Sequence, residues 1–176
     1  CRRPRPVCIR DRFEGINLLS MNETEKQRIR GGEIGVIFQD PLSSLNPVRR
    51  IGPQISEVIE LHLGLSTSAA QKQAVDMLNL VGIPNPESRM KQYPHELSGG
   101  MRQRVCIAMS IAGEPKLLIA DEPTTALDVT VQAQIVSLLK DLQKRLNMSI
   151  VLITHDIGVV SGMADYLAVM YAGRLI

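Results

Sequence analysis

Apolar positions follow two different periods along the chain, and the change of period predicts a fold that mixes helices and strands. Between positions 52 and 93, apolar residues recur at spacings of three and four, which predicts helices with one buried face each. Two such faces consist of Ile55, Val58, Ile59 and His62, and of Ala74, Met77, Leu78 and Val81. Ser66 and Ser68 offer N-caps for the second helix, and Gly82 followed by Pro84 is typical of a helix end.

Outside this region, short uninterrupted apolar runs predict strands. They lie at positions 34–39, 117–121 and 150–154, and the middle run has the composition of a buried parallel strand. Between the last two runs, positions 131–146 regain helical spacing, and packing alone accounts for their apolar face. A closing hairpin is expected to turn at Ala172 and Gly173. The alternation of strands and helices predicts an α/β fold with a parallel core.

Composition narrows the class of protein. The chain has 176 residues, of which 44% are hydrophobic and 22% charged, so a single globular domain is expected. Its formal net charge of +2 is too small to argue for nucleic-acid binding. Its three cysteines form no C-x-x-C pair, which favours a reducing compartment over zinc or disulfides. No apolar stretch reaches the roughly twenty residues of a membrane span. We therefore expect a soluble chain that reaches a membrane only through partners.

The first candidate for chemistry is a helix start. Ser98 is a good N-cap, Gly99 and Gly100 carry no side chains, and an amphipathic stretch follows from Met101 to Ala112. Backbone N–H groups at such a start, aided by the helix dipole, form an anion site that suits a phosphate. Taken alone, the same three residues equally describe an ordinary cap without a ligand.

The second candidate is a pair of carboxylates at the end of the central predicted strand. Asp121 and Glu122 follow its apolar run, and ligands of open α/β sheets collect beyond the carboxyl ends of the strands. One carboxylate there can hold Mg²⁺ with its hard oxygens, and its neighbour can polarise an attacking water. Taken alone, adjacent acids at a strand end are often simply solvated.

Gln39 and His155 also follow predicted strands. Each has a plain structural explanation, as a polar exit from a strand or as a satisfied loop residue. His155 is the stronger candidate for a functional residue, because its strand is expected to run parallel to the one that precedes Glu122. His62 and His95 lack such a position and are interpreted as packing or surface residues.

The order and spacing of these segments resemble the motifs of the ABC ATPases. The run LSGGMRQR at 97–104 resembles the signature motif, and LLIADEPTTALD at 117–128 resembles the Walker B strand with the D-loop. The run GVIFQDPLSSLNP at 35–47 is similar to the Q-loop of the ATPases that energise dipeptide and oligopeptide importers. The run IVLITHD at 150–156 resembles the switch-histidine strand.

The resemblance implies a role for each candidate. Glu122 is expected to be the general base, His155 the contact to the γ-phosphate, and Gln39 the sensor of Mg²⁺ and of the attacking water. Asp121 takes the position of the Walker B carboxylate toward Mg²⁺. The residues expected to contact ATP are Ser98, Gly99, Gly100, Gln103 and Asp128, with the first three gripping a nucleotide on the opposite subunit and Asp128 at the dimer seam. Asp128 also has a plain structural explanation, as the N-cap of a helix that starts near Val129.

By the same resemblance, the expected fold is a P-loop NTPase-like parallel core, at 13–40 and 114–176, with an inserted helical subdomain at about 41–113. The expected function is ATP binding and hydrolysis that energises peptide import. The implied partners are a second ABC ATPase subunit, identical or not, transmembrane permease subunits and, indirectly, an extracytoplasmic peptide-binding protein. No nucleic acid is expected, and the chain is expected at the cytoplasmic face of the cell membrane.

One family motif is absent from the printed sequence. None of the thirteen glycines is followed by lysine, so no G-x-x-x-x-G-K-[ST] segment is present. We interpret the chain as truncated before the Q-loop region and again before the family's C-terminal extension, with basic residues 1–12 unassigned. Such a chain is expected to bind ATP poorly alone. A non-catalytic remnant or interaction fragment stays an alternative; a DNA-repair or chromosome-organising ATPase is disfavoured because long heptads are lacking.

Overall fold

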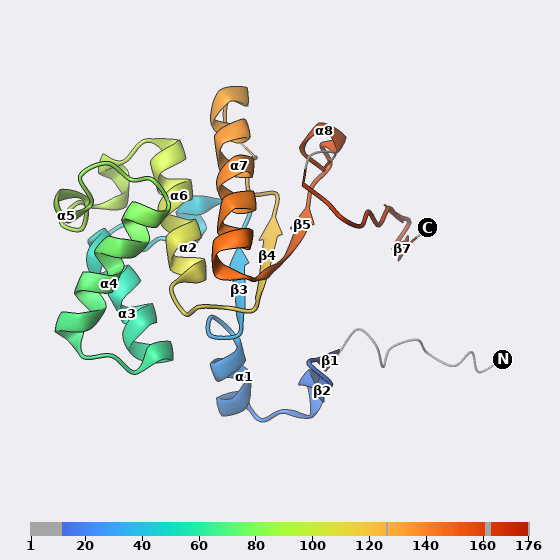
Figure 1. Ribbon diagram of the computed structural model, residues 1–176, viewed down its shortest axis with the longest axis horizontal. Helices are drawn as coiled ribbons and strands as arrows, with labels where there is room; N and C mark the ends of the chain where they lie inside the picture. Colours follow the sequence, from blue (N-terminus) through green and yellow to red (C-terminus); the bar gives the residue numbers. More distant parts are fainter. Residues whose placement is uncertain (1–11, 126, 161–162, 176) are drawn as a thin grey trace.

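A computed structural model describes residues 12–125, 127–160 and 163–175 of the chain. Figure 1 shows a small central sheet, with α2 to α6 gathered on one side and α7 running along the strands. The expected basic segment at the start of the chain lies outside the described residues, apart from Arg12. The expected α/β class with a parallel sheet is confirmed.

The central sheet is built from the three predicted apolar runs. It contains β3 (Ile34–Ile37), β4 (Leu117–Asp121) and β5 (Ser149–Ile153), in the order β3-β4-β5, with both pairs parallel. The strands end within two residues of the expected positions. Two short antiparallel hairpins form separate sheets, namely β1 (Arg12–Phe13) with β2 (Ile16–Asn17), and β6 (Met170–Tyr171) with β7 (Arg174–Leu175). The second hairpin confirms the turn expected at Ala172 and Gly173.

Most helices lie where the sequence predicts them. The helices are α1 (Glu23–Ile29), α2 (Pro41–Ser44), α3 (Ile51–Leu63), α4 (Thr67–Leu80), α5 (Pro86–Arg89), α6 (Gly99–Ile111), α7 (Val129–Leu146) and α8 (Ile157–Val160), with 3-10 turns at Leu18–Ser20 and Pro94–Glu96. The helices α1 and α8 were not predicted. Ser66 caps α4, because its side chain accepts a hydrogen bond from the backbone N–H of Ala69. Gly82 follows α4 with a positive φ of 72°, which explains why the helix ends there.

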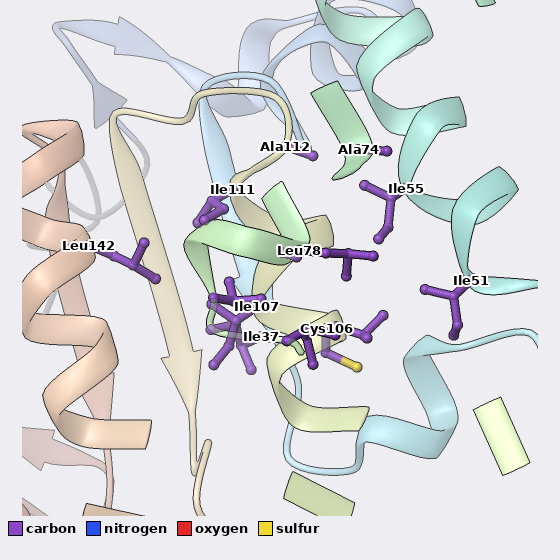
Figure 2. Packing of buried hydrophobic residues seen from close by; sticks show 14 of the residues in the cluster. Ile37, Ile51, Ile55, Ala74, Leu78, Cys106, Ile107, Ile111, Ala112 and Leu142 are labelled. Atoms are coloured by element: carbon purple, nitrogen blue, oxygen red, sulfur yellow. The ribbon is translucent and has the colours of Figure 1, made fainter. Parts of the chain in front are cut away.

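One hydrophobic core joins the helices to the sheet. Figure 2 shows side chains from β3, α3, α4 and α6 meeting in it, among them Ile37, Ile55, Leu78 and Ile107. All four are almost completely removed from solvent. Because α6 contributes a buried side chain on nearly every turn, this helix is held firmly against β3.

The two faces of the sheet differ. Leu118 and Ala120 point into the core and are fully buried, whereas Val36, Val151 and Ile153 are exposed on the other face. The strands therefore alternate between buried and exposed positions, in place of the continuous burial that is typical of parallel strands covered on both faces.

Candidate active site

Three side chains from three different strands converge at one edge of the sheet. Gln39 follows β3, Glu122 follows β4 and His155 follows β5. The Gln39 amide Nε2 donates a hydrogen bond of 2.7 Å to Glu122 Oε2, and His155 Nδ1 lies 3.1 Å from Glu122 Oε1. Parallel strands bring their carboxyl ends to the same edge, which places these residues together although they are far apart in sequence. The expected convergence of Glu122 and His155 is confirmed.

Local contacts fix the orientation of Glu122. Its backbone N–H donates to the Ile153 carbonyl at 2.9 Å, and the Thr125 hydroxyl donates to its Oε2 at 2.9 Å. The backbone of Glu122 has a φ of 45°, in the left-handed region that a residue with a side chain rarely adopts. Such strain concentrates at functional sites, where the surrounding structure holds the residue in place.

The contacts also set the charge of Glu122. The hydrogen bond to His155, followed by the one from Thr125, holds the pKa of the Glu122 carboxyl below its usual range, although partial burial opposes this shift. Glu122 is therefore a carboxylate at neutral pH. Its side chain is 25% exposed and that of His155 is 78% exposed, so the pair faces a space that a ligand can enter.

Asp121 ends β4 beside this cluster and is half-buried. Its carboxylate and the amide oxygen of Gln39 are hard oxygen donors of the kind that Mg²⁺ binds. Within the described part of the chain, no group of three or more His, Cys, Asp or Glu side chains is arranged to hold a metal ion.

The loop before α6 is a second, separate region. Ser98 is the N-cap, and its hydroxyl accepts a hydrogen bond of 3.3 Å from the Met101 backbone N–H. Ser98 and Gly99 are exposed, whereas Gly100 lies so close to α7 that an added Cβ would approach Val131 Cγ1 within 2.9 Å. Gly100 thus has a packing reason to be glycine, besides any role toward an anion.

Two further candidates have structural positions of their own. Gln103 faces the core and is 1% exposed, and its Nε2 has no hydrogen-bond partner among the described residues. Asp128 is the N-cap of α7, since its Oδ1 accepts a hydrogen bond of 2.9 Å from the Val131 backbone N–H. The capping function weighed for Asp128 is thereby confirmed. The roles of both residues toward a nucleotide stay predictions.

The structure thus brings Gln39, Glu122 and His155 together and leaves the Ser98 loop apart, since the loop takes no part in the hydrogen bonds of the trio. Sequence reasoning missed Thr125, which only its position three residues after Glu122 could have indicated. A cavity of about 800 Å³ lies elsewhere, along β3 and α1, with a mainly apolar lining.

The other histidines agree with their interpretation as packing or surface residues. His62 is half-buried against Gly31 and Gly32, and burial lowers its pKa. His95 is exposed and stacks on the ring of Tyr93, with 5.6 Å between the ring centroids.

Comparisons with known proteins agree with these motifs. The model of the ABC transporter family matches residues 10–125. The oligopeptide transport ATP-binding protein OppD of Bacillus subtilis (strain 168) is 62% identical over 164 residues, which cover 93% of this chain and 46% of the relative. The dipeptide transport ATP-binding protein DppD of Escherichia coli (strain K12) is 55% identical and is covered to 50%. The chain thus spans about half the length of the curated relatives it matches.

Solved structures give the same picture. The cbiO1 protein from Clostridium perfringens, part of the ABC transporter complex cbiONQ, has a TM-score of 0.80 and 32% identity, covering 93% of this chain and 62% of that one. The dimeric ATP-binding cassette MJ0796, in a post-hydrolysis state bound to ADP and Pi, has a TM-score of 0.72 and 30% identity, covering 84% of this chain and 62% of that one.

Among the described residues, none of the helices combines the length and apolar character needed to cross a membrane.

Proposed function

This chain belongs to the ABC transporter family, and from that premise we propose that it serves in ATP binding and hydrolysis that energise peptide import. The observation that carries the proposal is the convergence of Gln39, Glu122 and His155 at 2.7 Å and 3.1 Å, at the edge where α/β sheets bind ligands. The resemblance to oligopeptide and dipeptide transport proteins supports peptides as the cargo.

In this proposal, Glu122 accepts a proton from the water that attacks the γ-phosphate of ATP. Its lowered pKa keeps it ionised and therefore able to orient that water. His155 contacts the γ-phosphate and stabilises the charge that develops on the transferred group, and Gln39 positions the water. Phosphoryl transfer needs little covalent chemistry from the protein, so positioning and electrostatics suffice.

Mg²⁺ would be held by Asp121 and Gln39 together with the nucleotide's own oxygens. The bound ion supplies charge neutralisation at the phosphates. The contribution of the chain is to place Asp121 at the last residue of a rigid strand and Gln39 beside Glu122.

The Ser98 loop is proposed to act on a nucleotide held by a second ABC ATPase subunit, identical or different. The exposure of Ser98 and Gly99 supports this, since both are accessible at the start of α6. Backbone N–H groups at this helix start suit the terminal oxygens of ATP. Asp128 begins the neighbouring helix α7, and Gln103 supports the loop from inside α6.

The proposed membrane partners are permease subunits that dock on the helical layer formed by α3, α4 and α5. A cleft of about 450 Å³ lies there, lined by side chains that include Pro53, Val75 and Met90 among the charges of Lys72 and Glu87. Such a mixed cleft suits the end of a helix from another protein. This docking places the chain at the cytoplasmic face of the membrane, with an extracytoplasmic peptide-binding protein reached only through the permease.

The test of the proposal is the variant Glu122→Gln in the protein purified with its membrane partners. Hydrolysis of ATP is expected to fall by more than about a hundredfold, because the proton acceptor is lost, while ATP binding is retained. The matched control is Asp141→Asn, at an exposed position of α7, which should hydrolyse ATP normally. Normal turnover by Glu122→Gln would remove Glu122 from this role.

A second measurement addresses the 176-residue chain alone. Its sequence lacks the G-x-x-x-x-G-K-[ST] segment whose backbone cradles phosphates, so ATP titrated into the chain in a calorimeter is expected to bind weakly. Tight binding of ATP by the isolated chain would contradict this expectation.

A further inference from the structure

The side chain of Arg104, which belongs to α6, contacts two other helices at once, α4 and α7. We propose that Arg104 is a positioning residue. Its guanidinium fixes the position of the Ser98 loop relative to the helical layer of α3 to α5 and relative to α7. This inference rests on the proposed function, because it assigns a role toward the same loop. It concerns the orientation of α6 and not any contact of Arg104 with a nucleotide.

The first contact is with the end of α4. Arg104 Nη1 donates a hydrogen bond of 2.5 Å to the carbonyl of Val81, which is the C-cap residue of α4 and fully buried. Carbonyls at a helix C-terminus lack partners within the helix, and a cation is favourable there. Arg104 thus supplies a charged donor that the end of α4 requires.

Gly82 leaves space for this contact. An added Cβ at Gly82 would lie 3.0 Å from Arg104 Nη1, so a larger residue would displace the guanidinium. The positive φ of 72° at Gly82 favours glycine for a second reason. The end of α4 is therefore shaped to receive the side chain of Arg104.

The second contact is with α7. Arg104 Nη2 donates to the side-chain Oε1 of Gln134 at 3.4 Å, and one helical turn earlier Gly100 packs against Val131. The first two turns of α6 therefore meet the first two turns of α7. The start of α7 is tied in turn to the strand end, because Gln132 Nε2 donates to the Thr124 carbonyl at 3.1 Å.

These contacts form one connected path. A displacement at the end of α4, in the layer proposed to dock the permease, reaches α6 through Arg104 and thereby moves the Ser98 loop. The same guanidinium limits how far α6 can turn relative to α7. Coupling along this path is therefore measured at residues that Arg104 does not touch.

The first experiment measures amide hydrogen exchange in the 176-residue chain and in Arg104→Met, which keeps an unbranched apolar side chain and removes the guanidinium donors. Exchange is expected to become about tenfold faster at 78–83 and also within 99–102, at Met101 and Arg102, whose N–H groups donate hydrogen bonds to Ser98. The strands β4 and β5 should stay unchanged. The matched control is Arg145→Met, at an exposed position near the end of α7. Faster exchange at 78–83 alone would mean that Arg104 only caps α4, and would overturn the proposal.

Two further variants keep the proposal testable if Arg104→Met does not fold. Arg104→Lys retains one charged donor and should restore protection at 78–83 more fully than at 99–102. Gln134→Ala removes only the α7 contact from an exposed position, and should speed exchange at 99–102 without affecting 78–83. Unchanged exchange at 99–102 in both variants would also overturn the proposal.

The second experiment uses the assembled transporter and separates the two proposals. Arg104→Met is expected to lower ATP hydrolysis at saturating ATP by about tenfold and to weaken its stimulation by peptide, whereas Arg145→Met does neither. If Glu122→Gln hydrolyses ATP normally, the proposed function fails, whatever Arg104→Met does to exchange. If Glu122→Gln abolishes hydrolysis while Arg104→Met changes neither hydrolysis nor exchange at 99–102, only the inference on Arg104 fails.

Discussion

The Ser98 loop and the Glu122 cluster are both proposed to handle phosphate, but the chain builds them in opposite ways. The loop opens a helix whose inner face is buried in the core, and its capping hydrogen bond joins residues three positions apart. The cluster lies at exposed strand ends, and its contacts join residues 83 and 33 positions apart. The loop therefore depends on the stability of the core, whereas the cluster depends on the alignment of three strands.

This difference predicts that substitutions in the two regions change different properties of the protein, its stability in one case and its chemistry in the other. Substitutions of the buried apolar side chains of α6 are expected to unfold the chain before they reveal any chemical role. Substitutions in the cluster are expected to change the chemistry with little change in the free energy of unfolding, because exposed polar contacts contribute little to it. The following predictions test the comparison in order of decreasing effect.

The largest effect is expected from Ile107→Ala in α6. Ile107 is fully buried, and replacing a buried isoleucine by alanine leaves a cavity and costs about 2–5 kcal/mol of unfolding free energy. The control is Val151→Ala on the uncovered face of the sheet, where the side chain is 47% exposed. Denaturant unfolding should show a much smaller loss for the control; equal losses would contradict the assignment of stability to the α6 side.

A smaller effect is expected from Asp128→Ala, which removes the cap of α7. Loss of a capping acceptor costs about 1 kcal/mol, and the helix dipole adds to the loss because a negative charge is favourable at a helix start. Asp128→Asn keeps the acceptor and should retain most of the stability. A thermal denaturation series of the three proteins distinguishes these outcomes, and an unaffected Asp128→Ala would show that the cap contributes nothing.

The strained backbone at Glu122 gives a third prediction. Glu122→Gly and Glu122→Ala both remove the carboxylate, but only glycine adopts the φ of 45° without strain. The glycine variant should therefore melt about 3 °C higher than the alanine variant. The opposite order would show that the left-handed conformation is not kept in solution.

The smallest effect concerns pH. Because contacts in the folded chain lower the pKa of Glu122, its carboxylate stabilises the fold above the unfolded pKa of about 4.3. That contribution is lost as the pH falls through the lower, folded pKa. Glu122→Gln should therefore lose less stability than the native chain between pH 6 and pH 3, as measured by denaturant unfolding at each pH. Parallel pH curves would contradict the lowered pKa of Glu122 in the folded chain.

The features that could be predicted from the sequence are those that depend on residues close together along the chain. The N-caps at Ser66, Ser98 and Asp128 followed from the sequence, because each side chain bonds to a backbone N–H three residues ahead. The three strands followed from their apolar runs, although their ends differ by one or two residues. The positions of Glu122 and His155 at neighbouring strand ends also followed, once their strands were taken as parallel.

Other features were decided only by the tertiary structure. The sequence alone did not indicate that Gln103 faces the core, that Gly100 packs against Val131, or that Arg104 joins α4 to α7. Nor did it indicate that Thr125 donates to Glu122. Each of these depends on how whole helices and strands align, and that alignment is set by the combined packing of many side chains. A single residue's neighbours in sequence therefore determine its local conformation, but not its partners in space.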